Sequence, residues 1–134
     1  MIASTPDRSL IAASLLAGRI LIAALFLIEG VSKIGIYAAA GAYMARFGVP
    51  AALLPLVIAS EIGLGFALLF GWQTRWVALA LAGFCILAAL LFHRNFGNQN
   101  EFLHFQKDLA IAGGLLALFA CGGGKWSMDQ RSGA

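Results

Sequence analysis

Two charged residues interrupt long apolar stretches of the sequence and are the first candidates for chemistry. Arg19 lies near the middle of an apolar run over residues 10–28, and Glu61 is the only charge in a second run over residues 51–70. Both runs are long enough to cross a bilayer, where an unpaired charge is costly. If the two helices are antiparallel, both charges lie about 14 Å below the same membrane surface, because a helix rises about 1.5 Å per residue. We therefore predict a buried ion pair between Arg19 and Glu61.

Two interpretations of this pair stay open at the level of the sequence. A structural pair would fix the register of two helices and needs no ligand. A functional pair would offer a charge site for an anionic ligand, a proton or a quinone oxygen, since ionisable residues inside a membrane often mark functional sites. Lys33 and Asp108 extend this candidate ligand site. Lys33 shares one helical stripe with Arg19, and Asp108 is expected about 10 Å inside its nearer membrane face.

A second polar group is expected near the loops on one side of the membrane. Glu29 and Lys33 form an i, i+4 pair in the favourable order, although simple neutralisation of a snorkelling lysine explains them equally well. His93, His104 and Lys107 lie in the longest polar stretch of the chain. The two histidines lack the spacing of helix-borne metal sites, so we predict solvated side chains and no metal.

The composition indicates an integral membrane protein. The 134 residues are 61% hydrophobic and only 11% charged, outside the usual range of soluble domains. The net charge of +3 is spread over helix ends and loops, which favours contact with the membrane surface and not with nucleic acid. The counts of Lys and Arg on the two expected faces are nearly equal, so the positive-inside rule does not choose an orientation.

The apolar pattern predicts an all-α fold in a single domain: a transmembrane four-helix bundle that runs up-down-up-down. The expected spans lie near residues 10–34, 51–71, 75–93 and 103–122. The first run is too long for a signal peptide and carries Arg19, so we expect it to be a retained helix. A short interfacial helix is expected between the first two spans, because Gly48 and Pro50 follow it as stop signals.

Five segments in series resemble the DoxX family of small bacterial membrane proteins. They are GRILIAALFLIEGVSKI, RFGVP, SEIGLGFALLFGWQTR, KDLAIAGGLLALF and GGGKWSMD, within residues 15–129. The resemblance implies a multi-pass protein of the bacterial inner membrane with both termini in the cytoplasm. It also implies a link to redox chemistry, because some relatives are subunits of thiosulfate:quinone oxidoreductase and others work with soluble oxidoreductase partners.

These observations lead to one functional hypothesis and two alternatives. The hypothesis is a membrane subunit that anchors a soluble oxidoreductase and offers a quinone site near Arg19 and Glu61. No ligands for haem or iron–sulfur clusters and no flavin fingerprint are visible, so we expect no covalently bound cofactor and, at most, a non-catalytic or quinone-binding subunit. The alternatives are a small homo-oligomeric transporter, with Arg19, Glu61 and Asp108 along a polar path, and a membrane scaffold without a ligand.

Overall fold

The computed structural model describes residues 4–132, and most of this range is helical. Four helices are long and apolar enough to cross a membrane: α1 (Arg8–Gly35), α3 (Leu54–Phe70) with the preceding 3₁₀ turn η1 (Ala51–Leu53), α4 (Thr74–Phe92) and α5 (Gln99–Cys121). Two short helices, α2 (Tyr37–Arg46) and α6 (Met128–Arg131), complete the chain, and residues 4–132 contain no strand. The predicted all-α membrane fold with four candidate spans is confirmed.

Local sequence signals explain where the helices begin and end. The Asp7 side chain accepts a hydrogen bond from the Ser9 N–H at the start of α1, which satisfies a free N–H of the first turn. Gly71 ends α3 in the left-handed conformation, at φ 70°. The Asn98 side chain caps α5, so this helix begins at Gln99, earlier than the predicted residue 103. Helix α2 forms as predicted, and its position at the membrane interface stays a prediction.

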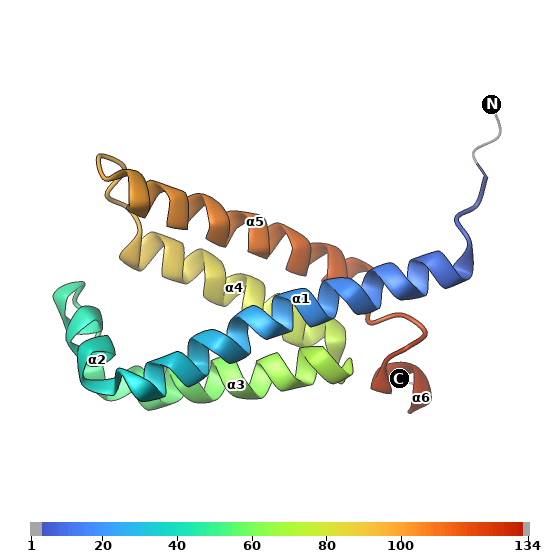
Figure 1. The fold of residues 1–134 in the computed structure, drawn as a ribbon, viewed down its shortest axis with the longest axis horizontal. Helices are drawn as coiled ribbons and strands as arrows, with labels where there is room; N and C mark the ends of the chain where they lie inside the picture. Colours follow the sequence, from blue (N-terminus) through green and yellow to red (C-terminus); the bar gives the residue numbers. More distant parts are fainter. Residues whose placement is uncertain (1–3, 133–134) are drawn as a thin grey trace.

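The long helices pack as two pairs, α1 with α3 and α4 with α5. Figure 1 shows that the pairs lie close together near α6 and separate toward α2. Small core residues on all four long helices let the backbones approach closely. The main core lies among these helices and includes Ala23, Phe26, Leu68, Val77, Ala78, Leu81, Ala82, Cys85, Ala112, Leu115 and Leu118.

The two ends of the bundle therefore differ. We call the end with the α3–α4 turn and residues 122–132 the terminal end, and the end with α2 and residues 93–98 the loop end. At the loop end, the rings of Tyr43 and Phe47 lie 5.6 and 5.4 Å from the ring of Phe92, so that α2 reaches across to α4. The helix pairs are thus bridged by aromatic contacts where they are furthest apart.

Candidate functional site

Arg19 is buried, with 1% of its surface exposed, and lies at the terminal end of the bundle. Its Nη1 donates to the backbone carbonyls of Leu68 and Leu69, at 3.4 and 3.1 Å, and its Nη2 donates to the carbonyl of Trp126. The carbonyls at the C-terminus of a helix lack partners within the helix and carry a partial negative charge. Arg19 therefore caps α3 and joins it to the C-terminal segment.

The predicted ion pair between Arg19 and Glu61 is wrong, because the register of α1 against α3 differs from the one assumed. Gly30 faces α3 at the level of Glu61, where an added Cβ would lie 2.7 Å from Ile62 Cγ1. Gly65 likewise packs against Leu27. Since Gly30 follows Arg19 by eleven residues, the two charges are separated by about 16 Å along the helix axis.

Glu61 pairs with Lys33 instead. Lys33 Nζ lies 2.9 and 3.1 Å from the two carboxylate oxygens of Glu61, and 3.5 Å from Glu29 Oε2 one turn away on α1. Glu61 is 4% exposed and the Lys33 side chain 25% exposed. The predicted contact between Glu29 and Lys33 is present, but its main partner lies on the neighbouring helix.

The polar residues of α4 and α5 form a second cluster at the loop end. His93 Nδ1 lies 2.8 Å from Glu101 Oε2, and His93 Nε2 lies 3.8 Å from Asp108 Oδ2. The rings of His93 and His104 stack with their centroids 5.2 Å apart. These histidines were predicted to be solvated separately, and the start of α5 at Gln99 instead brings them together.

Lys107, the remaining residue of the predicted loop-face group, is exposed and makes no ion pair within residues 4–132. The sequence suggested Lys107, Lys33 or a histidine as the partner of Asp108, and the structure selects His93. Within the same range, no group of three or more His, Cys, Asp or Glu side chains is arranged to hold a metal ion.

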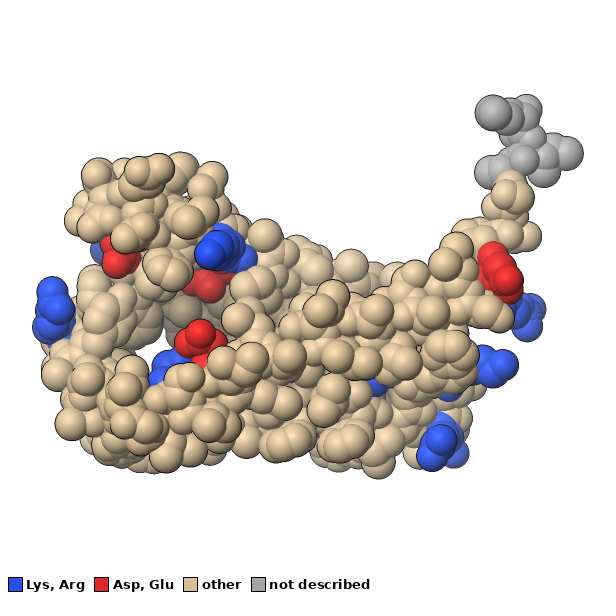
Figure 2. Space-filling view, viewed as in Figure 1, with Lys and Arg blue, Asp and Glu red and all other residues tan. Residues whose placement is uncertain are grey.

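The two clusters face each other across a hollow, which we call the loop-end hollow. Figure 2 shows acidic and basic side chains gathered around it, between the two helix pairs. Asp108 on one wall lies within electrostatic range of Glu29 on the other. The buried Cys85 is within electrostatic range of both Asp108 and Glu61. The walls are formed by Glu29, Lys33 and Glu61 on one side, and by His93, His104 and Asp108 on the other.

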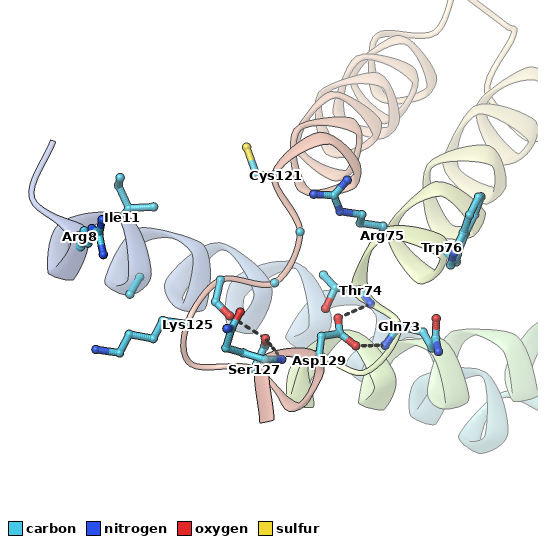
Figure 3. Close-up of a pocket in the computed structure, with 15 residues that line it drawn as sticks. Arg8, Ile11, Gln73, Thr74, Arg75, Trp76, Cys121, Lys125, Ser127 and Asp129 are labelled. Carbon is cyan, nitrogen blue, oxygen red and sulfur yellow. Dashed lines mark hydrogen bonds between the residues drawn. The ribbon is translucent and has the colours of Figure 1, made fainter. Parts of the chain in front are cut away.

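The terminal end contains a second arrangement, which the sequence interpretation missed. The Asp129 carboxylate accepts hydrogen bonds from the backbone N–H groups of Gln73 and Thr74, at 2.7 and 2.9 Å (Figure 3). The Asp129 N–H donates to the carbonyl of Gly71. The C-terminal segment thereby folds back on the α3–α4 turn. The only local signal for it was Ser127, whose side chain caps α6.

The same contacts set the charge state of Asp129. Burial acts to raise the pKa of its carboxyl group. The polar Thr74 side chain and the two backbone N–H groups oppose burial more strongly, and the positive charge of Arg19 adds to them. The pKa of Asp129 therefore lies below its ordinary value, and the carboxylate form is the one that holds the segment in place.

The sequence match decides the family. The DoxX family model matches residues 14–94, which is more than half of the chain. The chain belongs to the DoxX family. Inner membrane protein YqjF of Escherichia coli (strain K12) is 48% identical to this DoxX protein over 115 residues, covering 86% of this chain and 88% of the relative. Inner membrane protein YphA of the same organism is 28% identical over 124 residues, with 87% and 89% covered. No solved structure matches the chain.

These relatives and the four candidate spans make this DoxX protein a multi-pass protein of the inner membrane, as the family resemblance implied. The side on which the termini lie stays a prediction. The family match includes Arg19, Lys33 and Glu61, whereas Asp108 and Asp129 lie beyond it. The wall formed by α1 and α3 is thus part of the matched region, while α5 and the C-terminal segment lie outside it.

Proposed function

We propose that this DoxX protein is the membrane subunit of a quinone-linked oxidoreductase system and that the loop-end hollow binds the headgroup of the quinone. The observation that carries the proposal is the pair of opposed polar walls. Lys33 and Glu61 are in contact at 2.9 Å on one wall, and His93 lies between Glu101 and Asp108 on the other. Ionisable groups within apolar spans are costly and are commonly retained for binding or proton transfer.

The side chains suit a ligand whose two carbonyl oxygens lie on opposite sides of a ring. Lys33 and His93 would each donate a hydrogen bond to one oxygen, and each already has a carboxylate partner that could stabilise its charge. Reduction of a quinone to a quinol takes two electrons and two protons. The electrons would come from a soluble oxidoreductase partner, while Glu61 and Asp108 are placed to pass protons to the donors.

The packing below the hollow supports binding in preference to permeation. The buried core begins at Cys85 and continues through Ala82 and Leu81 toward the terminal end. At that end, Arg19 occupies the space between α1 and α3. A polar path through one copy of the chain would have to open this packed region, whereas a ligand entering from the loop end would not.

Binding can be tested on the full chain in lipid nanodiscs with short-tailed benzoquinone and naphthoquinone probes, by calorimetry. We expect Lys33→Met and His93→Leu each to weaken binding by about 10- to 100-fold, since each removes one hydrogen bond from a charged donor. Lys125→Met at the terminal end and Arg94→Gln beside His93 are matched controls and should bind like the unmodified protein.

Two results would contradict the proposal. One is that neither class of quinone binds the unmodified protein at millimolar concentration, which would leave a scaffold role. The other is that quinone binds equally well to both hollow variants, which would place the quinone elsewhere. Recovery of a soluble oxidoreductase with the tagged protein in mild detergent tests the anchoring role separately.

A further inference from the structure

A cavity of about 610 Å³ lies at the terminal end, away from the loop-end hollow. It is bounded by the first turns of α1, the start of α4 and the glycine-rich segment that follows α5 (Figure 3). These are the ends of three candidate membrane spans. The cavity is therefore expected at the depth of the lipid headgroups.

The charges that line this cavity are mostly positive. Arg8, Arg75 and Lys125 contribute +3 and Asp129 contributes −1, which gives a net charge of +2. The two oxygens of Asp129 already accept backbone hydrogen bonds. Within residues 4–132, none of the three basic side chains forms an ion pair. The cavity thus offers three cations that lack a partner.

Two of the walls are built for close approach of an oxygen-rich group. The Arg75 guanidinium lies against Gly122, where an added Cβ would be 3.3 Å from Arg75 Nε. Gly122 and Gly124 have φ values of 78° and 82°, which favour glycine and leave their backbone uncovered by a Cβ. The Thr74 hydroxyl is buried in the same wall and has no hydrogen-bond partner in the part of the chain that the structure describes. Buried polar groups without partners are rare and commonly belong to binding sites.

The other side of the cavity is apolar. Ile11 and Ala12 line it from α1, and Trp76, which is 66% exposed, lines it from α4. Tryptophan is enriched at the level of the headgroups. A ligand with an anionic group beside an acyl chain would match both sides of this cavity.

We propose that this cavity is a binding site for a phosphate group, held by Arg8, Arg75 and Lys125. Basic pockets at the ends of membrane helices suit anionic headgroups, and guanidinium groups match phosphate geometry. The phosphate could belong to an anionic phospholipid or to a soluble phosphate compound. The site is independent of the proposed quinone site, because it lies at the opposite end of the bundle and shares no residue with it.

The test uses the purified full chain in detergent, with lipid binding followed by native mass spectrometry. One arm adds phosphatidylglycerol or cardiolipin, a second adds zwitterionic phosphatidylcholine, and a third adds inorganic phosphate as a competitor. We expect Arg75→Gln with Lys125→Gln to weaken binding of the anionic lipid by about 30-fold, or about 5-fold for each charge removed. The matched control is Arg46→Gln with Arg94→Gln, two exposed cations at the loop end, and it should change binding less than 2-fold. If the first variant fails to fold, Arg8→Gln with Lys125→Gln keeps Arg75 against Gly122 and tests the same site.

Cys121 provides a second measurement, because it is exposed and lines the cavity, while Cys85 is buried. An occupied cavity should slow maleimide labelling of Cys121 in the unmodified protein and not in the double variant. Protection by anionic lipid alone assigns the site to a lipid headgroup, and protection by inorganic phosphate assigns it to a soluble phosphate group. Equal binding of both lipid classes, or equal losses in the terminal-end and loop-end variants, would overturn the proposal.

Discussion

Arg19 at the terminal end and Glu61 at the loop end are almost equally buried, at 1% and 4% exposed, but they are stabilised differently. Arg19 is held by three backbone carbonyls, so its partners are part of the helix framework. Glu61 is held by the side chain of Lys33, which also contacts Glu29 and is a quarter exposed. Backbone partners cannot leave, whereas side-chain partners can exchange with a ligand. The comparison assigns a structural role to Arg19 and makes the loop-end hollow the better place for chemistry.

The largest effect is expected from Arg19→Ala. The change leaves the carbonyls of Leu68, Leu69 and Trp126 without their donor and creates a cavity, so we expect a loss of about 3–5 kcal/mol in the free energy of unfolding. Arg19→Lys should recover only part of it, because an ammonium lacks the guanidinium fork. Unfolding in mixed detergent micelles measures the loss, and faster trypsin cleavage at Lys125 reports release of the C-terminal segment.

Arg8→Ala is the control for this experiment, since Arg8 is an exposed cation near the start of the same helix. It should change the free energy of unfolding by less than about 0.5 kcal/mol. If Arg19→Ala were equally mild, the carbonyl cap would contribute little and the contrast between the two ends would fail.

The next effect separates the two charged residues by double-mutant cycles. Lys33→Met and Glu61→Leu should each cost about 2 kcal/mol, and the double variant should cost at least 1 kcal/mol less than the sum, because the two side chains are in contact. Arg19→Met combined with Glu61→Leu should instead be additive within about 0.5 kcal/mol. A coupling energy above 1 kcal/mol between Arg19 and Glu61 would show that the register of α1 and α3 differs from the one described.

Burial of the charges could be predicted from the sequence, but their partners could not. Hydropathy locates the spans, and any charge within them must be shielded, which holds for Arg19 and Glu61. The partners depend on the register of α1 against α3, which is set by the contacts of Gly30 and Gly65. Aligning the ends of two apolar runs ignores these contacts, and an error of eleven residues moved Arg19 opposite the wrong part of α3.

The contacts at the terminal end were harder to anticipate for a different reason. Asp129 lies outside every span and contacts Gln73 and Thr74, which precede it by more than fifty residues. No periodic pattern predicts such a return of the chain. The family resemblance included GWQTR and GGGKWSMD as separate segments and gave no indication that they meet. Whether the residues of the loop-end hollow bind a ligand stays a prediction.

A smaller effect tests the register itself through two glycines on α1. Gly30→Ala should cost about 1–2 kcal/mol, because its Cβ would lie 2.7 Å from Ile62 Cγ1 and 3.2 Å from Glu61 Cβ. Gly18→Ala, with no atom within 4 Å of the added Cβ, should be neutral or stabilise the helix by up to about 1 kcal/mol. Thermal unfolding in detergent compares them. Equal stabilities of the two variants would remove the close approach that fixes Glu61 opposite Gly30.

The smallest effect concerns the pH dependence of the C-terminal segment. The pKa of Asp129 is lower in the folded protein than its ordinary value of 3.8, so its contribution is fully present above that value and is lost as the pH falls through the lower folded pKa. With Trp72→Phe and Trp76→Phe, fluorescence reports on Trp126 alone. Its emission should stay constant from pH 7 to about 4 and shift to longer wavelength in stronger acid. Asp129→Asn should show the shifted emission already at pH 7, because the amide carries no charge and can present only one acceptor oxygen to the two N–H groups. An acid transition that is unchanged in Asp129→Asn would mean that another group holds the segment against the α3–α4 turn.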